Sequence, residues 1–239
     1  MVYNTFTTPI ASAIGCETPT AKVMGVSALY MPPIPKRKTI VYIDSWNLYY
    51  GSLNNRGVGY KWLNIESWLQ KILPNYDIQK IKFFTARSSG KYDPTKPIRQ
   101  AIFFRALDTL SNLEKTEGIF LFKIKSVFTT VGNRVMAEIP EEKGTDVNLA
   151  VHLVNDAHNK KFETAVIVSN DSDFAEAVRI VTQELQLEVG ILSPFKRFSR
   201  ELCKYATFAR NVRKGAIKSS QFPNNMTDAN GDFSKPPSW

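Results

Sequence analysis

Short apolar runs alternate with amphipathic segments through the middle of the chain. β-branched and aromatic runs predict strands at residues 39–43, 78–84, 119–128, 164–168 and 187–192. Apolar residues at helical spacing predict helices over residues 65–73, 97–115, 145–159 and 173–185. Pro97 suits a first helical turn, because its missing N–H would have no partner there. This alternation predicts an α/β fold with a doubly wound, mostly parallel sheet flanked by helices.

The pattern stops near both ends of the chain. Residues 1–35 carry almost no charge and finish in a proline-rich stretch, which predicts a poorly ordered leader or an arm packed on the surface. Residues 215–239 mix Ser, Asn, Asp, Gly and Pro, a composition typical of a flexible tail. The folded domain is therefore expected over residues 36–214.

Composition narrows the choice of partners. The 31 Lys and Arg residues exceed the 22 Asp and Glu residues, and a net charge of +9 favours a polyanion such as nucleic acid. No run approaches the ~18 apolar residues needed to span a bilayer, and residues 1–13 lack the basic start of a secretion signal. The two cysteines form no CxxC pair. These features predict a cytoplasmic protein with reduced thiols and no membrane partner.

Aspartates occupy the positions where a parallel sheet places its ligands. Asp44 directly follows the strand at 39–43, Asp171 follows the strand at 164–168, and Asp173 comes two residues later. Asp146 opens the helix at 145–159. Ligands bind beyond the carboxyl ends of parallel strands, and carboxylates gathered there repel one another unless a cation neutralises them. Mg²⁺ or Mn²⁺, which prefer oxygen ligands, are the natural occupants.

Each aspartate also has a structural interpretation. Asp173 and Glu176 have the spacing of a capping box, and Thr145 or Asp146 can cap or begin a helix. Asp44 is harder to explain structurally, because burial at the end of an apolar strand is costly without a partner. The four aspartates together favour a metal site, provided that the strand order brings them together.

Three segments resemble the signature motifs of the NYN domain family, a branch of the PIN-like nucleases. Residues 43–49 read IDSWNLY, similar to the family's I-D-G-x-N-L. Residues 143–147 read KGTDV, similar to K-G-V-D-V, and residues 168–174 read VSNDSDF, similar to V-S-G-D-S-D-F. The three segments occur in the family's order, and the resemblance covers roughly residues 38–195.

The resemblance implies a PIN-like fold and a metal-dependent ribonuclease acting on RNA. Mg²⁺ or Mn²⁺ would be held by Asp44, Asp146, Asp171 and Asp173. Asn47 would lie beside Asp44 and contact metal-bound water or substrate. Metal-assisted hydrolysis requires no histidine base, and by analogy with the family it would leave a 5′-phosphate and a 3′-hydroxyl.

The chain departs from the family pattern at three positions. Ser45 and Asn170 replace glycines, and asparagine tolerates the left-handed backbone that a glycine provides. His152 stands where many relatives carry a further aspartate. Because His152 lies six residues after Asp146, it faces another side of the helix, so the change need not disrupt the metal cluster.

Basic and aromatic side chains near the predicted connections are candidates for contacting RNA. The basic candidates for substrate binding are Lys143, Arg87, Arg99, Lys196, Arg197 and Arg200. Each can equally be a solvated surface charge, and Lys143 is favoured by its place in a motif. Aromatic residues within 46–50 can stack on the bases of single-stranded RNA, although most aromatic residues are expected in the core.

A non-catalytic function remains open at this point. A PIN-like fold can also serve as an RNA-binding or regulatory module, and four mutually repelling carboxylates argue against that alternative. A ribonuclease built on a histidine pair is disfavoured, because His152 and His158 lie on different faces of one predicted helix. A homodimer is plausible, but no motif predicts one.

Overall fold

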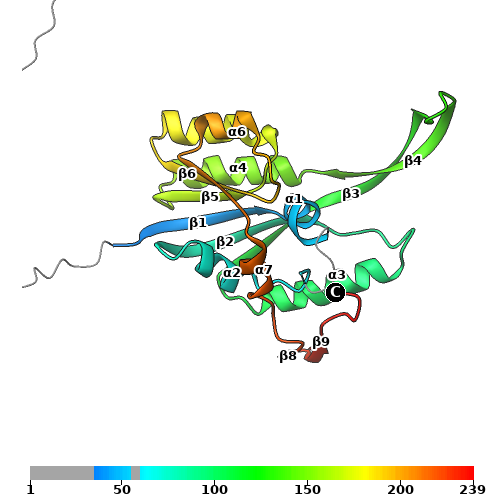
Figure 1. Cartoon of the computed structure of the whole chain (residues 1–239), viewed down its shortest axis with the longest axis horizontal. Coiled ribbons are helices and arrows are strands. Elements are labelled where there is room, and N and C mark those ends of the chain that lie inside the picture. Colours follow the sequence, from blue (N-terminus) through cyan, green and yellow to red (C-terminus); the bar gives the residue numbers. More distant parts are fainter. Residues whose placement is uncertain (1–34, 55–59) are drawn as a thin grey trace, which may run out of the picture. The chain divides into compact units, whose positions relative to one another are not determined.

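The computed structural model of the chain describes residues 35–54 and 60–239, which form a seven-stranded sheet with helices on both faces (Figure 1). The strands follow the order β4-β3-β2-β1-β5-β6-β7, and all neighbours are parallel except β3 and β4. Their bounds are β1 (Arg37–Asp44), β2 (Tyr76–Ala86), β3 (Leu113–Phe128), β4 (Arg134–Lys143), β5 (Thr164–Val168), β6 (Glu188–Ser193) and β7 (Phe208–Asn211). The predicted fold class is confirmed.

Helices connect successive parallel strands. They are α1 (Ser45–Leu48), η1 (Tyr49–Leu53), α2 (Ile65–Ile72), α3 (Thr95–Asp108), α4 (Thr145–His158), η3 (Ser172–Phe174), α5 (Ala175–Arg179), η4 (Ile180–Glu184) and α6 (Arg200–Tyr205). Of the described helices, none is long and apolar enough to cross a membrane. Nearly all of the leader predicted for residues 1–35 lies outside the described residues.

The chain changes direction across the sheet at β1. After β1 it adds β2 and β3 on one side, and α4 then returns it to the other side of β1, where β5, β6 and β7 follow. Such a reversal leaves a crevice at the carboxyl ends of the two central strands, which is where open α/β sheets bind ligands. The crevice here lies between the ends of β1 and β5.

Two apolar layers hold the sheet between its helices. Successive side chains of a strand point to opposite faces, so Val41 and Ile43 pack with α2 and α3, while Ile40 and Tyr42 pack with α4 and α5. Ile40, Val41, Tyr42 and Ile43 are at most 4% exposed, as expected for a central strand covered on both faces. This double burial fixes the carboxyl end of β1 rigidly.

Some predicted boundaries were wrong. The helix expected over residues 97–115 ends at Asp108, because Leu113 and its neighbours pair with β2 as the start of β3. The helix expected over 173–185 is divided into η3, α5 and η4. Strands β4 and β7 were not predicted; the described part of β3 beyond Gly118 pairs with β4 alone in a projecting hairpin (Figure 1).

The segment predicted as a flexible tail is folded against the core instead. It forms α7 (Lys214–Lys218) and a hairpin of β8 (Asn225–Asp228) and β9 (Gly231–Ser234). The rings of Phe222, Phe233 and Trp239 lie 5.8–6.5 Å from the buried Trp62 ring, whose Nε1 donates to the carbonyl of Pro223 at 2.8 Å. A few well-spaced aromatic anchors outweigh the polar composition on which the prediction rested.

Candidate active site

Asp44 is the last residue of β1, and it is held in place by neutral donors. Its Oδ1 accepts the backbone N–H of Asn47 at 3.0 Å and thereby caps α1. Its Oδ2 accepts the hydroxyl of Ser169 at 3.0 Å. Asp44 is only 5% exposed. Each carboxylate oxygen still has a lone pair for a further ligand, because it accepts one hydrogen bond here.

Ser169 joins the ends of β1 and β5. Its hydroxyl donates to Asp44, and its oxygen accepts the backbone N–H of Asp171 at 3.1 Å. Asp171 in turn caps η3 with Oδ1, which accepts the N–H of Asp173 at 3.1 Å. The capping residue is thus Asp171, and not Asp173 as the capping-box spacing suggested. Asp171 is half-buried, and Asp173 is exposed.

Asn47 connects the same two strand ends by a second route. Its Oδ1 accepts the backbone N–H of Asn170 at 2.9 Å. The side chain of Asn170 then accepts from the N–H of Ser199 at 2.8 Å and donates to the carbonyl of Arg197 at 3.0 Å. The carbonyl end of Asn47 therefore holds the backbone, and only its amide end is left to meet a water molecule or substrate.

Asp146 enters the crevice from the start of α4. Gly144 is the N-cap residue, with φ of 92°, a left-handed conformation that glycine adopts without strain. Asp146 lies in the first helical turn and is half-buried. Thr145, whose hydroxyl donates to the carbonyl of Thr85 at 3.4 Å, fixes this turn against the end of β2. Neither Thr145 nor Asp146 provides the predicted side-chain cap.

The electrostatics show which carboxylates lie together. Burial raises the pKa of Asp44 from its ordinary 3.8 to about 6, and the Asp146 and Asp171 carboxylates raise it further against the lowering effect of the bonds from Asn47 and Ser169. The main causes of this shift do not include Asp173. The fold thus brings together Asp44, Asp146 and Asp171, while Asp173 is linked to them through its backbone N–H.

The donor chemistry of this crevice suits a hard divalent cation. Within the part of the chain that the structure describes, no group of three or more His, Cys, Asp or Glu side chains is arranged so that it could hold a metal ion. Mg²⁺, however, commonly takes only one or two protein carboxylates and fills its remaining positions with water and phosphate oxygens. Asp44 and Asp171, linked through Ser169, meet that smaller requirement.

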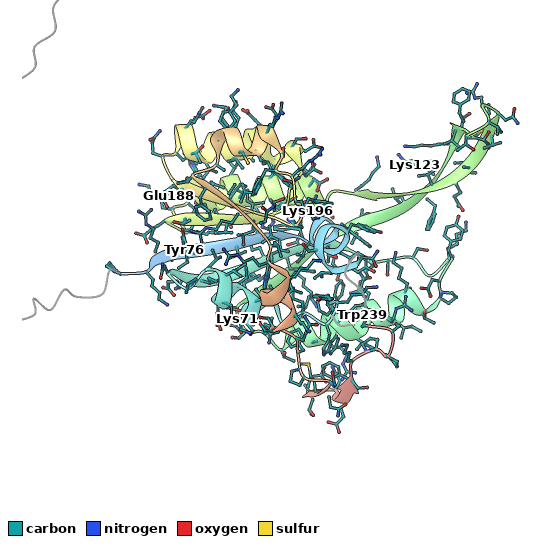
Figure 2. All side chains as sticks on the ribbon, viewed as in Figure 1. Lys71, Tyr76, Lys123, Glu188, Lys196 and Trp239 are labelled. Atoms are coloured by element: carbon teal, nitrogen blue, oxygen red, sulfur yellow. The ribbon has the colours of Figure 1, made fainter. Side chains whose placement is uncertain are left out.

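Three of the basic candidates lie on the segment that follows β6. Lys196 and Arg197 are exposed on the loop, and Arg200 is the first residue of α6. The bonds from Asn170 to the backbone of this loop hold it at the carboxyl end of β5. Figure 2 shows Lys196 at the same edge of the sheet as α1. The backbone of this basic loop therefore lies beside the acidic crevice.

Gly51 allows this loop to pack closely. A Cβ atom at Gly51 would lie 2.7 Å from Pro194 Cβ and 2.8 Å from the Phe195 ring, closer than real contacts allow. Ser52 adds a hydrogen bond from its hydroxyl to the carbonyl of Pro194 at 2.8 Å. The absence of a side chain at Gly51 thus lets η1 support the basic loop.

The other basic candidates have different surroundings. Arg87 is exposed and forms a two-bond ion pair with Glu117 at 2.6 and 2.9 Å. Lys143 is the exposed last residue of β4. Arg99 pairs with Asp93 at 2.7 Å and lines a cavity next to the crevice. The structure therefore does not place the six basic candidates at one surface.

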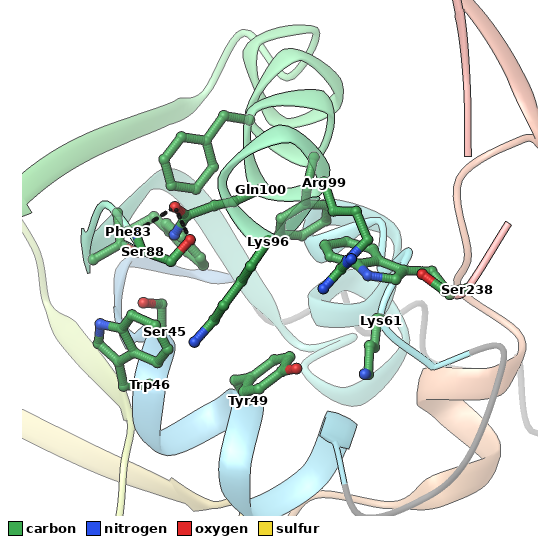
Figure 3. A pocket seen from close by; sticks show the side chains of 14 residues that line it. Ser45, Trp46, Tyr49, Lys61, Phe83, Ser88, Lys96, Arg99, Gln100 and Ser238 are labelled. Carbon is green, nitrogen blue, oxygen red and sulfur yellow. Dashed lines mark hydrogen bonds between the residues drawn. The ribbon is translucent and has the colours of Figure 1, made fainter. Parts of the chain in front are cut away.

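That cavity has a volume of about 260 Å³ and lies between α1, η1 and α3 (Figure 3). Ser45 and Trp46, which directly follow Asp44, form one wall, and none of the four aspartates lines it. Trp46 and Tyr49 belong to the segment predicted to stack on bases. The remaining members come from segments far apart in the sequence, among them Lys61, Lys96 and Trp239.

Two groups of site residues were missed from the sequence. Ser169, which binds Asp44 and Asp171, was detectable in principle as a small polar residue directly after a buried strand. Lys61, Lys96 and Trp239 carried no such signal. Their convergence depends on how α3 and the chain's last residues pack.

A mostly parallel sheet with acidic side chains at its switch point is consistent with an α/β fold of the PIN-like type. The model of the NYN domain matches residues 38–210, most of the chain, and the chain therefore belongs to the NYN domain family. The family resemblance expected from the three motifs is confirmed.

Two individual proteins are similar to this chain. A crystal structure of a protein of unknown function from Vibrio parahaemolyticus shares the fold, with a TM-score of 0.52 and 18% identity over 77% of this chain and 97% of that one. The 6-hydroxy-3-succinoylpyridine 3-monooxygenase HspA of Pseudomonas putida is 29% identical over 237 residues, 84% of this chain and 75% of the relative.

Proposed function

We propose that this chain is a divalent-metal-dependent ribonuclease that hydrolyses phosphodiester bonds in single-stranded RNA. The observation that carries the proposal is the convergence of Asp44, Asp146 and Asp171 at the switch point of the sheet, where burial and the other two carboxylates raise the pKa of Asp44. Membership of the NYN family, which suggests a nuclease-like fold, supports the same conclusion.

The four aspartates have unequal parts in this proposal. Asp44 and Asp171 would be the primary ligands of Mg²⁺ or Mn²⁺, because Ser169 binds the Asp44 carboxylate and the Asp171 backbone N–H, and the two carboxylates lie close enough to interact. Asp146 and Asp173 would bind the metal's water molecules from the two sides of the crevice. A bound divalent ion lowers the pKa of water and stabilises the attacking and leaving oxygens of the phosphodiester. The products would carry a 5′-phosphate and a 3′-hydroxyl.

Asn47 would orient a water molecule or a phosphate oxygen. Its carbonyl oxygen is already engaged with Asn170, so its amide end is the donor that remains for this task. The same bond keeps the ends of β1 and β5 in register. Asn47 would therefore have two roles: it positions the ends of the two strands, and it contacts the water molecule or phosphate directly.

The RNA backbone would follow the basic loop after β6. Lys196, Arg197 and Arg200 lie beside the crevice and can neutralise successive phosphates. Lys143, at the end of β4 just before α4, would meet the strand on the opposite side. Arg87 would contribute less, because Glu117 already binds its guanidinium.

Cleavage of labelled single-stranded RNA tests the proposal. Wild-type protein should cut the RNA with Mn²⁺ or Mg²⁺ and stop cutting in EDTA. Asp44→Asn and Asp171→Asn should each reduce the rate by at least about a hundredfold, as expected when a catalytic ion's ligand is lost. Asp108→Asn is the matched control, because Asp108 is an exposed aspartate that pairs with Lys115 at the end of α3.

Two results would count against the proposal. Equal cutting by wild type and both site variants would show that the activity does not depend on the crevice. Intact RNA with wild type, together with unchanged RNA binding in all variants, would favour the non-catalytic RNA-binding module instead.

Oxygenation of a small aromatic acid is a second candidate, favoured by the cavity beside Asp44. The cavity combines aromatic and cationic side chains, and the relative HspA is named for a substituted pyridine. A monooxygenase also consumes a reductant, because one atom of O₂ becomes water. Oxygen uptake with 6-hydroxy-3-succinoylpyridine and a reduced nicotinamide cofactor would support this candidate, and RNA cleavage without such uptake would exclude it.

A further inference from the structure

We propose that the cavity between α1, η1 and α3 binds a planar aromatic ring that carries a negatively charged group. Aromatic walls and cationic side chains occur together there, outside the acidic crevice (Figure 3). The inference does not depend on metal-assisted cleavage, since it concerns binding at residues other than the aspartates.

Aromatic side chains form the walls of the cavity. Trp46 meets the edge of Tyr49, with ring centroids 6.3 Å apart. On the other side, Trp239 packs at 5.6 Å against Phe103, so that aromatic rings line two sides of one space. Rings arranged in this way favour a planar ligand, because stacking and edge contacts add to the gain from burial.

Cationic side chains reach into the same space. Lys96 extends from α3 toward Trp46 and Tyr49, and its Nζ lies 5.4 Å from the centre of the Trp46 ring (Figure 3). Lys61 Nζ lies 5.5 Å from the centre of the Tyr49 ring. Contacts with ring faces stabilise these cations only weakly, much less than a buried ion pair would.

The charge in the cavity is not balanced from within. Arg99 has Asp93 as its partner, but neither Lys61 nor Lys96 forms an ion pair in the part of the chain that the structure describes. Both lysines are half-buried, which weakens their hydration. An anionic group of a ligand would restore the lost electrostatic stabilisation through charge-assisted hydrogen bonds.

The size of the cavity limits the ligand. Its volume of about 260 Å³ is near the lower end of small-molecule sites, roughly 300 Å³ and above, and so suits a single ring with a short substituent. The cationic lining disfavours a metal ion. A nucleotide of an RNA strand and a free aromatic carboxylate share the required chemistry, a planar ring with an attached anion.

Calorimetric titration of the full chain in EDTA tests the inference without any cleavage. Uridine 5′-monophosphate and pyridine-3-carboxylate serve as the two probes. Their controls are half-ligands, molecules that lack either the charged group or the ring. Uridine lacks the charge, pyridine-3-carboxamide lacks the carboxylate, and inorganic phosphate lacks the ring. At least one anionic probe should bind about tenfold more tightly than its half-ligands, the size expected for one charge-assisted hydrogen bond.

Matched variants locate the binding. Lys96→Gln should weaken the binding of the probe about tenfold. Lys96→Arg should keep most of the wild type's affinity, because only the positive charge is required. Trp46→Leu should weaken binding by removing the ring contact. Lys80→Gln is the control, because Lys80 pairs with Glu114 on β2 and does not line the cavity.

The outcomes identify the ligand or overturn the proposal. Preference for uridine 5′-monophosphate would make the cavity a nucleotide subsite next to the crevice. Preference for pyridine-3-carboxylate would make it a site for a small aromatic acid. No binding of either anion, or binding that Lys96→Gln and Trp46→Leu leave unchanged, would overturn the proposal. Asp171→Asn should bind the probe like wild type, so that failed cleavage and failed binding are distinguishable.

Discussion

Two buried aspartates in this molecule have opposite electrostatic surroundings. Asp156, on α4, is 1% exposed and accepts bonds from Tyr42 at 2.8 Å, from Lys161 at 2.9 Å and from Lys82. Asp44, on β1, is 5% exposed and, among residues 35–54 and 60–239, accepts bonds only from a backbone N–H and a serine hydroxyl. One carboxylate is neutralised by the protein itself, and the other is not.

Their acidities differ accordingly. Burial opposes ionisation of Asp156, but the hydrogen bonds from Lys82, Lys161 and Tyr42 together outweigh it and lower the pKa. Burial raises the pKa of Asp44 to about 6, with nearby carboxylates adding to the effect. The difference teaches that burial alone does not mark a functional carboxylate. A buried carboxylate without an internal cation is the one suited to an external cation.

Removing the neutralised aspartate should give the largest effect on stability. Asp156→Ala should lower the free energy of unfolding by about 3–5 kcal/mol, because it leaves the buried ammonium of Lys82 without its partner. Urea denaturation measures the loss. Asp108→Ala, at an exposed ion pair with Lys115, should cost less than about 1 kcal/mol. Equal losses of stability in the two variants would show that the buried pair of Asp156 and Lys82 contributes no more than the exposed pair of Asp108 and Lys115.

Replacing Asp44 should change the free energy of unfolding in the opposite direction. The pKa of Asp44 is raised from 3.8 to about 6 in the folded state, so its contribution to stability is fully present below pH 3.8 and is lost as the pH rises through 6. In EDTA at pH 7, Asp44→Asn should therefore raise the free energy of unfolding, by up to about 3 kcal/mol. Denaturation at pH 4 and pH 7 checks this. A destabilised variant with the wild type's pH profile would refute it.

A divalent ion should supply what Asp44 lacks. At a hundred times its Kd, Mn²⁺ should stabilise the wild type by about 2.7 kcal/mol, because it binds only the folded state. Thermal unfolding with and without Mn²⁺ should show this gain in wild type and Asp156→Asn, but not in Asp171→Asn. Asp173→Asn should keep most of the gain, because Asp173 is exposed and joins Asp171 through its backbone N–H. Complete loss in Asp173→Asn would make Asp173 a primary ligand.

Local sequence was enough to predict the class of fold and the main acidic positions. The strand at 39–43 and the strand at 164–168 were found because fully buried strands read as continuous apolar runs. Asp44 and Asp171 were found because each directly follows such a strand. Both signals lie within a few residues of the position that they predict.

Pairing across the sheet could not be predicted in the same way. The spacing of apolar residues predicts a helix that includes Leu113, whereas pairing with β2 makes Leu113 the start of β3. Phe222, Phe233 and Trp239 lay in a segment of polar composition, and only their packing on Trp62 shows that it is folded. Local spacing contains no information about such distant partners.

The sequence by itself therefore determined the α/β class, the NYN motifs and the aspartates that end the strands. Only the tertiary structure decided that Asp44 lies with Asp146 and Asp171, that Ser169 holds two of them, and that Lys96 faces Trp46. The physical reason is that periodicity and strand ends are properties of neighbouring residues. Electrostatic coupling and cavity walls arise between segments that come together only when the sheet order is complete.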